Sequence, residues 1–318
     1  MSDTGAVIAI HGGAGAIQRE KLGPDGYEAA LAGLREALLA GWARLSAGAS
    51  ALDGVEAAVM SLEDNPLFNA GRGACFNADG IHELDASIMD GKTLAAGAIA
   101  ASRTIRNPVV AARAVMERTG HLLLSGDGAD AFATAEGIAQ EPQSYFHTER
   151  QQRNLAKARA RHLGEDSGPV SDAERHGTVG AVARDRHGNL AAATSTGGMT
   201  YKRPGRVGDT PIIGAGTYAR NGVCAVSCTG SGEVFIRVCA SHEIAARIAY
   251  RGDGLDAAAR AVLFEEIDAL GGNGGLVAVD AAGMVSMPYS SAGMYRGAID
   301  ANGMMHVGIY EELVSEPV

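Results

Sequence analysis

The chain lacks long hydrophobic runs and has few cysteines. No apolar stretch reaches the roughly 20 residues that a transmembrane helix needs, so we expect no membrane partner. Residues 1–5 have neither the basic start nor the apolar middle of a secretory signal peptide, which favours a cytoplasmic protein. Only four cysteines occur in 318 residues. Because they form no Cys-x-x-Cys pair, we expect reduced, buried thiols rather than a metal site or a disulfide framework.

Positive charge is also scarce, and several familiar site motifs are missing. The sequence has 27 Lys and Arg against 37 Asp and Glu, a formal net charge of −10, which argues against a nucleic-acid partner. Gly13-Ala14-Gly15 begins a dinucleotide-binding pattern, but Gln18 stands where its third glycine belongs. His242-Glu243 is followed by Arg247 where a zinc protease needs a second histidine. No phosphate-binding loop and no Gly-x-Ser-x-Gly elbow occurs.

What is present is a large apolar fraction with regular helix and strand patterns. The sequence is 46% hydrophobic and contains 44 glycines, as expected for a sizeable core with many tight turns. Apolar periodicity and turn residues predict helices at 26–48, 108–118, 129–137, 148–162, 233–250 and 254–269. They predict one more helix directly after 26–48, capped by Ser50 and Asp53. They predict strands at 7–10, at 84–102 with a turn at Asp90-Gly91, and at 179–184, 189–196, 212–217, 224–228, 276–280 and 284–288.

One clear break in composition separates two halves of the chain. Residues 164–177 replace the apolar pattern with Gly, Ser, Pro and charged residues, and such a segment cannot bury enough surface to order itself strongly. Each half supplies both strands and helices. We therefore expect a single catalytic domain, residues 1–318, interrupted by a mobile, cleavable linker at 164–177.

Threonines provide the candidate chemistry, and Thr178 follows this linker directly. A threonine hydroxyl is a weak nucleophile unless a base removes its proton. If the Gly177–Thr178 bond is cut, Thr178 becomes a chain terminus, and its α-amine, with an ordinary pKa of about 7.7–8.0, supplies that base. A lone threonine at the start of a strand is usually inert, so the argument depends on the surrounding motifs.

Those motifs resemble the plant-type asparaginases, also called isoaspartyl peptidases, which are N-terminal nucleophile hydrolases of the threonine type. The resemblance spans nearly the whole chain and rests on the runs at 11–15, 66–71, 176–180, 194–198, 204–209, 228–233 and 293–296. It implies an α+β fold, a four-layer αββα sandwich. It also implies self-cleavage between Gly177 and Thr178 into an α subunit, 1–177, and a β subunit, 178–318, which assemble as a dimer of αβ heterodimers.

The resemblance assigns a role to each site residue. Thr178 is the nucleophile, Thr196 assists it, and Asn69 helps to orient it. The Thr229 side chain and the Gly230 backbone N–H form the oxyanion hole.

The remaining positions concern the substrate and an ion. Arg206 and Asp209 match the α-carboxylate and α-ammonium of an aspartyl group, and Ser231 and Gly232 complete the substrate site with Thr229 and Gly230. No organic cofactor is implied. A structural sodium ion is implied in the loop 62–72, held by the backbone carbonyls of Leu62, Glu63, Asn65, Phe68, Ala70 and Arg72.

The sequence therefore predicts an isoaspartyl peptidase and L-asparaginase that hydrolyses β-aspartyl dipeptides and the side-chain amide of asparagine. Two alternatives stay open. One is a glycosylasparaginase-like amidase, which shares the fold and nucleophile. The other is a binding protein whose chain is never cut.

Overall fold

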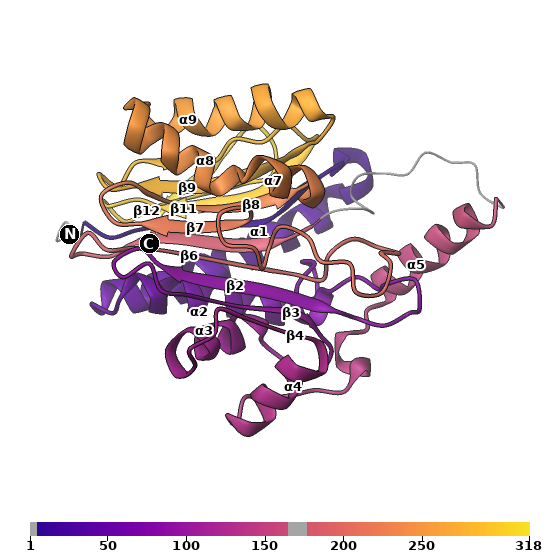
Figure 1. Ribbon diagram of the computed structural model, residues 1–318. Helices are drawn as coiled ribbons and strands as arrows, with labels where there is room; N and C mark the ends of the chain where they lie inside the picture. Colours follow the sequence, from indigo (N-terminus) through magenta and orange to yellow (C-terminus); the bar gives the residue numbers. More distant parts are fainter. Residues whose placement is uncertain (1–4, 165–176) are drawn as a thin grey trace.

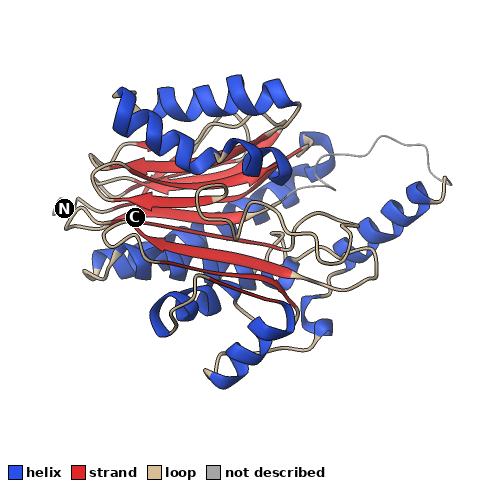
Figure 2. Ribbon diagram, in the orientation of Figure 1, coloured by secondary structure: helices blue, strands red, loops and turns tan. Residues whose placement is uncertain are grey.

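The computed structural model describes residues 5–164 and 177–318, which form four layers in the order helices, sheet, sheet, helices (Figures 1 and 2). The two sheets pack face to face, and each is covered by helices on its outer side. The predicted αββα sandwich is confirmed. The predicted linker, 164–177, falls mostly outside the described residues. No helix in the described ranges is long and apolar enough to cross a membrane.

The larger sheet has the strand order β13-β12-β11-β1-β5-β6-β2-β3-β4, which places β5 in the middle. Its strands are β1 (Val7–Gly15), β2 (Leu84–Asp90), β3 (Ala96–Ser102), β4 (Leu123–Ser125), β5 (Val179–Arg184), β6 (Leu190–Thr196), β11 (Gly293–Ile299), β12 (Met304–Gly308) and β13 (Val314–Pro317). Only the β3–β4 pair is parallel. The outer face of this sheet is covered by α1 (Arg19–Ser46), α2 (Ala51–Asp64) and α3 (Pro108–Arg118).

The smaller sheet has the order β10-β9-β8-β7. Its strands are β7 (Thr217–Arg220), β8 (Cys224–Gly230), β9 (Gly274–Asp280) and β10 (Val285–Ser286). It is covered by α7 (Gly232–Val238), α8 (Ala240–Ala246) and α9 (Leu255–Ala261). Two more helices, α4 (Gly126–Ala135) and α5 (Glu149–His162), lie toward the edge of the molecule, and α5 leads toward the undescribed residues.

Because side chains alternate along a strand, β1 contributes residues to two hydrophobic cores, one on each face of the larger sheet. In β1, Ile8 and Ile10 pack toward α1 and α2, whereas Val7 and Ala9 pack toward the smaller sheet. A strand that is buried on both faces reads as a nearly continuous apolar run. The layer between the sheets is built largely from small residues such as Ala192, which allows the two backbones to approach closely.

Most sequence-predicted elements are confirmed, with four differences. The predicted strand 212–217 is wrong, because successive turns fold Asp209 to Gly216 back on itself and β7 begins only at Thr217. The helix predicted at 233–250 is broken at Cys239, which has a left-handed backbone with φ of 53°. The helix predicted at 254–269 changes to π-helical turns after Ala261. Strand 284–288 does not end the chain, since β11, β12 and β13 follow.

The predicted cap of α2 is present in full. The Ser50 hydroxyl accepts a hydrogen bond from the Asp53 N–H at 3.2 Å, and Asp53 Oδ2 accepts one from the Ser50 N–H at 3.1 Å. These reciprocal bonds satisfy donors that the first helical turn leaves without intrahelical partners. This helix carries the candidate site loop at its other end, so the cap stabilises the element that positions the site.

We expect Ser50→Ala to lower the free energy of unfolding by about 1 kcal/mol, because the first turn of α2 loses its side-chain acceptor. Urea unfolding measures the change. Ser46→Ala is a matched control, because Ser46 lies at the end of α1 and caps no N–H group. Equal losses in the two variants would contradict the capping assignment.

Candidate active site

Thr178 lies immediately before β5, the central strand of the larger sheet, and is 8% exposed. Pairing of β5 with β1 and β6 places Thr178 beside the end of β6. There its hydroxyl donates a hydrogen bond to Thr196 Oγ1 at 3.1 Å. The predicted nucleophile and its predicted assistant are thus brought into direct contact, from positions 18 residues apart.

The carbonyl oxygen of Gly177 accepts two hydrogen bonds. Asn69 Nδ2 lies 2.6 Å from it, and Thr196 Oγ1 lies 3.1 Å from it. The orientation of the Asn69 amide is fixed because its Oδ1 accepts the Cys75 N–H at 2.8 Å, and its Nδ2 also donates to the Gly198 carbonyl. Asn69 therefore lies against the carbonyl that precedes Thr178, whereas the Thr178 hydroxyl contacts Thr196.

Gly13 allows β1 to pass close to this peptide bond. Its φ is +109°, and the strand register shifts between His11 and Gly13. A Cβ atom on Gly13 would lie 3.0 Å from Gly177 Cα and 3.2 Å from the Thr178 nitrogen. Both the backbone conformation and the lack of space therefore require glycine at this position.

A small cavity joins most of the predicted site. Its lining among the described residues includes Gly177, Thr178, Thr196, Arg206, Asp209 and Gly230. Gly232 also lies beside the predicted anchors, since a Cβ atom on it would meet Asp209 Oδ1 at 2.9 Å and Arg206 Nη2 at 3.0 Å. Two predicted residues have other contacts: Thr229 Oγ1 accepts the Ala14 N–H at 3.2 Å, and Ser231 Oγ accepts the Asn273 N–H at 3.2 Å.

The charges of the predicted anchor are arranged around Arg206. Glu233 accepts a bidentate pair of hydrogen bonds from Arg206 Nε and Nη2, both at 2.9 Å. This pair fixes the guanidinium by one edge. Asp209 is buried, and no donor among the described residues lies within hydrogen-bond distance of its Oδ2. Burial raises the pKa of Asp209 to about 7, against the opposing effect of Arg206.

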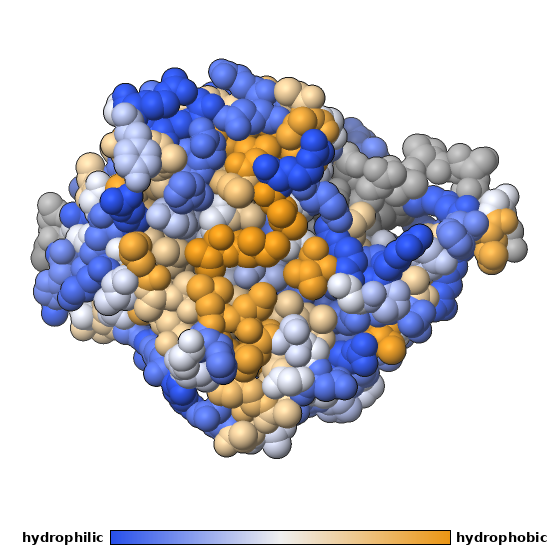
Figure 3. All heavy atoms as spheres, viewed as in Figure 1, coloured by the Kyte–Doolittle hydropathy of each residue, from blue (hydrophilic) through white to orange (hydrophobic). Residues whose placement is uncertain are grey.

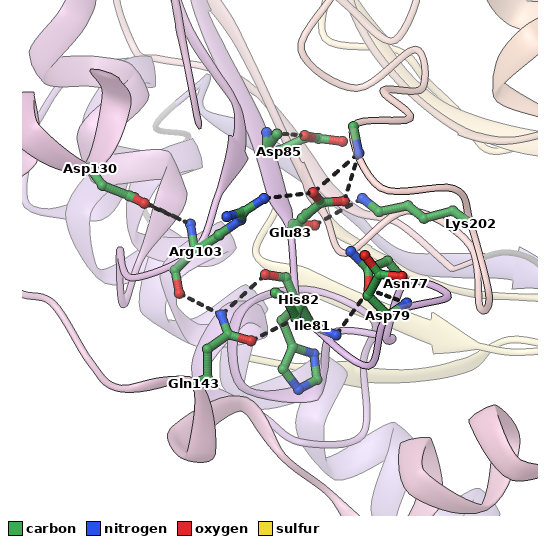
Figure 4. A network of polar contacts seen from close by, with 12 residues as sticks. Asn77, Asp79, Ile81, His82, Glu83, Asp85, Arg103, Asp130, Gln143 and Lys202 are labelled. Atoms are coloured by element: carbon green, nitrogen blue, oxygen red, sulfur yellow. Dashed lines mark hydrogen bonds and ion pairs between the residues drawn. The ribbon is translucent and has the colours of Figure 1, made fainter. Parts of the chain in front are cut away.

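A buried glutamate holds the loop that carries Arg206 (Figure 4). Both carboxylate oxygens of Glu83 accept the Gly205 N–H, at 3.2 and 3.1 Å, and Lys202 Nζ donates to the Glu83 carbonyl at 3.0 Å. Arg103 adds an ion pair to the same carboxylate at 3.5 Å. The loop residue before Arg206 is therefore tied to the segment that leads into β2.

A chain of hydrogen bonds between the two sheets ends on the backbone of Thr178. His11 Nδ1 lies 2.8 Å from the Thr178 carbonyl oxygen, which only accepts, so Nδ1 carries the proton and Nε2 accepts from the Ser227 hydroxyl at 2.9 Å. Thr194 then donates to Ser227 at 2.7 Å, and Thr217 donates to Thr194. Burial lowers the pKa of His11 to about 3, which keeps the imidazole neutral as this chain requires.

Sequence reasoning assigned no role to His11, Ser227 or Glu233. One signal was available: Ser227 and Thr229 are two residues apart on β8, as Thr194 and Thr196 are on β6. Because strand side chains alternate, each pair lies on one face of its strand. Two polar pairs on strands with mainly apolar residues indicate a polar layer between the sheets.

The loop predicted to hold a sodium ion wraps around the carboxyl end of α2. A Cβ atom on Gly71 would lie 2.5 Å from the Glu63 carbonyl oxygen, and one on Gly73 would lie 1.9 Å from the Phe68 carbonyl oxygen. Glycine at these two positions therefore lets the loop close over its own carbonyl groups. Backbone carbonyls at a helix C-terminus favour a cation, which fits the expected ion. Within residues 5–164 and 177–318, no three His, Cys, Asp or Glu side chains form a metal-binding group.

Glu63 is buried at the same helix end and accepts the Val109 N–H, at the start of α3, at 3.0 Å. Burial raises the pKa of its carboxyl group to about 8, and this outweighs the opposing hydrogen bonds. The side chain is therefore mainly uncharged at neutral pH, and it links α3 to the helix that carries the site loop.

The two packed sheets and the threonine before the central strand define the N-terminal nucleophile class of hydrolases. Within that class, the chain belongs to the asparaginase family, whose sequence pattern matches residues 4–309. It is 52% identical to an isoaspartyl peptidase of Salmonella typhimurium, over 96% of this chain and 99% of the relative, and 50% identical to one of Escherichia coli, over 96% and 97%. It is 45% identical to an isoaspartyl peptidase/L-asparaginase of Xenopus laevis, over 96% and 95%. The family resemblance stated from the sequence is confirmed.

Glu63→Gln is expected to remove part of the pH dependence of stability. Folded Glu63 keeps its proton up to a pKa of about 8, whereas the unfolded group has a model value of 4.5. Its contribution is complete below pH 4.5 and is lost as the pH rises toward 8, by at most about 1.4 kcal/mol per pH unit. Glutamine has the same shape and no proton to lose.

The unfolding midpoint, measured across that pH range, should fall less steeply in Glu63→Gln than in the wild type. Glu312→Gln, at an exposed position, is the control and should keep the wild-type slope. Parallel curves for Glu63→Gln and the wild type would show that this carboxyl group titrates as it does in the unfolded chain.

Proposed function

We propose that the chain cuts itself between Gly177 and Thr178 and then hydrolyses β-aspartyl dipeptides and the side-chain amide of L-asparagine. The observation that carries this proposal is one cavity that joins the Thr178 and Thr196 hydroxyls to Arg206 and Asp209. Relatives named isoaspartyl peptidase or isoaspartyl peptidase/L-asparaginase, at 42–52% identity, support the substrate class.

Self-cleavage uses the contacts around the Gly177 carbonyl. The Thr178 hydroxyl attacks the carbonyl carbon of Gly177 and passes its proton toward Thr196. Asn69 and Thr196 donate to the oxygen on which negative charge develops. The Gly177–Thr178 C–N bond breaks, and the proton passes from Thr196 to the nitrogen, which becomes the α-amine of Thr178. Water then hydrolyses the ester, which leaves the Gly177 carboxylate and a free Thr178 hydroxyl.

Arg206 and Asp209, which carry opposite charges, bind the two charged groups of the substrate. Glu233 fixes one edge of the Arg206 guanidinium, and the rest of it pairs with the substrate α-carboxylate. Ionised Asp209 pairs with the α-ammonium. Because the pKa of Asp209 is raised to about 7 in the empty site, the arriving ammonium favours its ionised form.

Hydrolysis then proceeds in two steps. The α-amine of Thr178 takes the hydroxyl proton as Oγ1 attacks the β-carbonyl carbon, and the Thr229 side chain and Gly230 N–H receive the oxyanion. The C–N bond to the leaving amine breaks, and the proton passes to that amine. Water, activated by the same α-amine, hydrolyses the β-aspartyl ester and releases aspartate.

The loop at 62–72 would hold a sodium ion through its backbone carbonyls and so brace Asn69, and no organic cofactor takes part.

We also infer a dimer of αβ heterodimers in the cytoplasm. Hydrophobic residues gather across the middle of the face seen in Figure 3. Exposed apolar groups lie at the edge of the larger sheet, where Leu123 in β4 is 45% exposed and Leu122, just before it, is 49% exposed. An interface between copies would bury such groups.

Thr178→Ala should remain one intact chain, whereas the wild type should yield two fragments that end at Gly177 and begin at Thr178. The alanine variant lacks the attacking oxygen, so it should also be inactive toward asparagine. Intact-mass spectrometry decides the first point, with Thr134→Ala, at an exposed position on α4, as a control that keeps the cleavage. A wild-type protein that stays whole indefinitely would favour the binding-protein alternative. Faster hydrolysis of a glycosylated asparagine than of β-aspartyl dipeptides would favour the glycosylasparaginase alternative.

Arg206→Ala should raise KM for asparagine by roughly 100-fold, because the substrate α-carboxylate loses a charged, partly buried partner. Self-cleavage should stay nearly intact, since the donors around the Gly177 carbonyl are Asn69 and Thr196. Steady-state kinetics and denaturing electrophoresis measure the two effects separately. An uncut Arg206→Ala chain would mean that this side chain supports the loop rather than the substrate.

A further inference from the structure

A second cavity lies beside Gly177, and its lining among the described residues does not include Arg206 or Asp209. It has a volume of about 220 Å³, against the ~30 Å³ that one water takes in the liquid, and so has room for a group of amino-acid size. It lies between the end of β1, the first turn of α1, the loop that carries Asn69, and the first turn of α5. Asn69 and Gly177 in its lining belong to the proposed self-cleavage, but no role has so far been assigned to the space itself.

Gly177 lines both this cavity and the cavity that contains Arg206 and Asp209. The residue cut in self-cleavage therefore forms a wall between the two spaces. Thr178 lines the cavity that contains Arg206 and Asp209. Once the Gly177–Thr178 bond is broken, the chain no longer holds Gly177 at that position, and we expect the two cavities to join beside Thr178.

The orientation of a bound substrate follows from the anchor. The aspartyl charges are held at Arg206 and Asp209, and the β-carbonyl carbon must meet Thr178 Oγ1. The bond to the leaving amine then points away from the anchor, toward the position of Gly177. A dipeptide's second residue extends in that direction, whereas the ammonia released from asparagine needs no space beyond it.

The lining of the second cavity combines apolar groups with two cations. Ile17, Leu22 and Tyr295 supply apolar surface. Lys21 and Arg150 supply positive charge, and among the residues that the structure describes neither has a carboxylate partner within 4.0 Å. Arg150 Nη2 donates to the Pro66 carbonyl at 3.2 Å, which positions its guanidinium beside the loop that carries Asn69.

We propose that this cavity binds the leaving residue of a β-aspartyl dipeptide, with Arg150 and Lys21 pairing with its free α-carboxylate and the apolar wall contacting its side chain. This inference rests on the proposed function and extends it: it names the part of the enzyme that distinguishes a β-aspartyl dipeptide from asparagine. In this proposal, Lys21 on α1 and Arg150 on α5 give the enzyme its preference for a leaving group that carries a carboxylate. Both residues lie outside the threonine motifs.

The experiment compares β-aspartyl-leucine with β-aspartyl-leucinamide, which differs only in lacking the terminal negative charge. In the cleaved wild-type enzyme, kcat/KM should be higher for the acid than for the amide. In Arg150→Gln, the ratio of the two values should fall about tenfold, since a hydrogen bond to a charged group is lost. Lys21→Gln should lower the same ratio. Rates are normalised to the cleaved fraction, and both substrates are assayed on one preparation, so a general loss of activity cancels.

Arg153→Gln is the matched control, because Arg153 lies one turn further along α5, is 67% exposed and pairs with Glu149. It should leave the ratio at the wild-type value. As a test that needs no variant, rising ionic strength should weaken the wild-type preference for the acid.

Two failures can be told apart. If the wild type hydrolyses the acid and the amide equally well at low salt, and Arg150→Gln does not change this, the cavity does not bind the carboxylate and only this inference is overturned. If the cleaved wild type hydrolyses neither compound nor asparagine, the proposed function itself is overturned.

Discussion

The hydrogen bond from Asn69 Nδ2 to the Gly177 carbonyl oxygen, 2.6 Å long, connects the parts on which the site depends. Asn69 belongs to the loop after α2, and its own position is fixed by Cys75, Gly197 and Gly198. It thereby determines where the peptide bond before β5 lies relative to the end of β6. The close approach of Gly13 confines the same peptide bond from the side of β1. The proposed attack of Thr178 on its own backbone would need this restriction, because a small misplacement of the reacting atoms has a large effect on rate.

Three ionisable groups of the site, Arg206, Asp209 and His11, are held in different charge states. Around Arg206 the charges are already paired, by Glu233 directly and by Glu83 through the neighbouring backbone, so the guanidinium is fixed before any ligand arrives. Asp209 is held differently: burial leaves its carboxyl group close to the balance between its two protonation states at neutral pH. His11 is kept neutral and connects the Thr178 carbonyl to hydroxyl groups of both sheets. The site thus combines a permanently charged Arg206, an Asp209 that can gain or lose a proton near neutral pH, and a neutral His11.

Local pattern was sufficient for much of the fold but not for its long-range parts. The α2 cap and the β2–β3 hairpin could be predicted because neighbouring residues determine them. Strands β11 to β13 could not, since β11 depends on pairing with β1, far away in the sequence, and its apolar pattern is interrupted by Gly293 and Gly297. The segment 212–217 has strand-forming residues, but tertiary turns determine its course. Motifs were sufficient to predict roles for the threonines and for Arg206 and Asp209, whereas the contact between Asn69 and Gly177 spans 108 residues and depends on the folded chain.

The strand order has a consequence for the lifetime of the molecule. In the larger sheet, strands from before and after residue 177 alternate in blocks: β13-β12-β11, then β1, then β5-β6, then β2-β3-β4. The proposed cut at Gly177 would leave two chains that both contribute strands throughout that sheet. Neither chain could separate without breaking backbone hydrogen bonds on both sides of at least one strand. Refolding of the uncut chain is a unimolecular process, but after the cut it requires two polypeptides to meet and becomes dependent on concentration. The lifetime of the cleaved protein would therefore depend on a slow rate of unfolding. Its unfolding would be much harder to reverse than that of the uncut precursor.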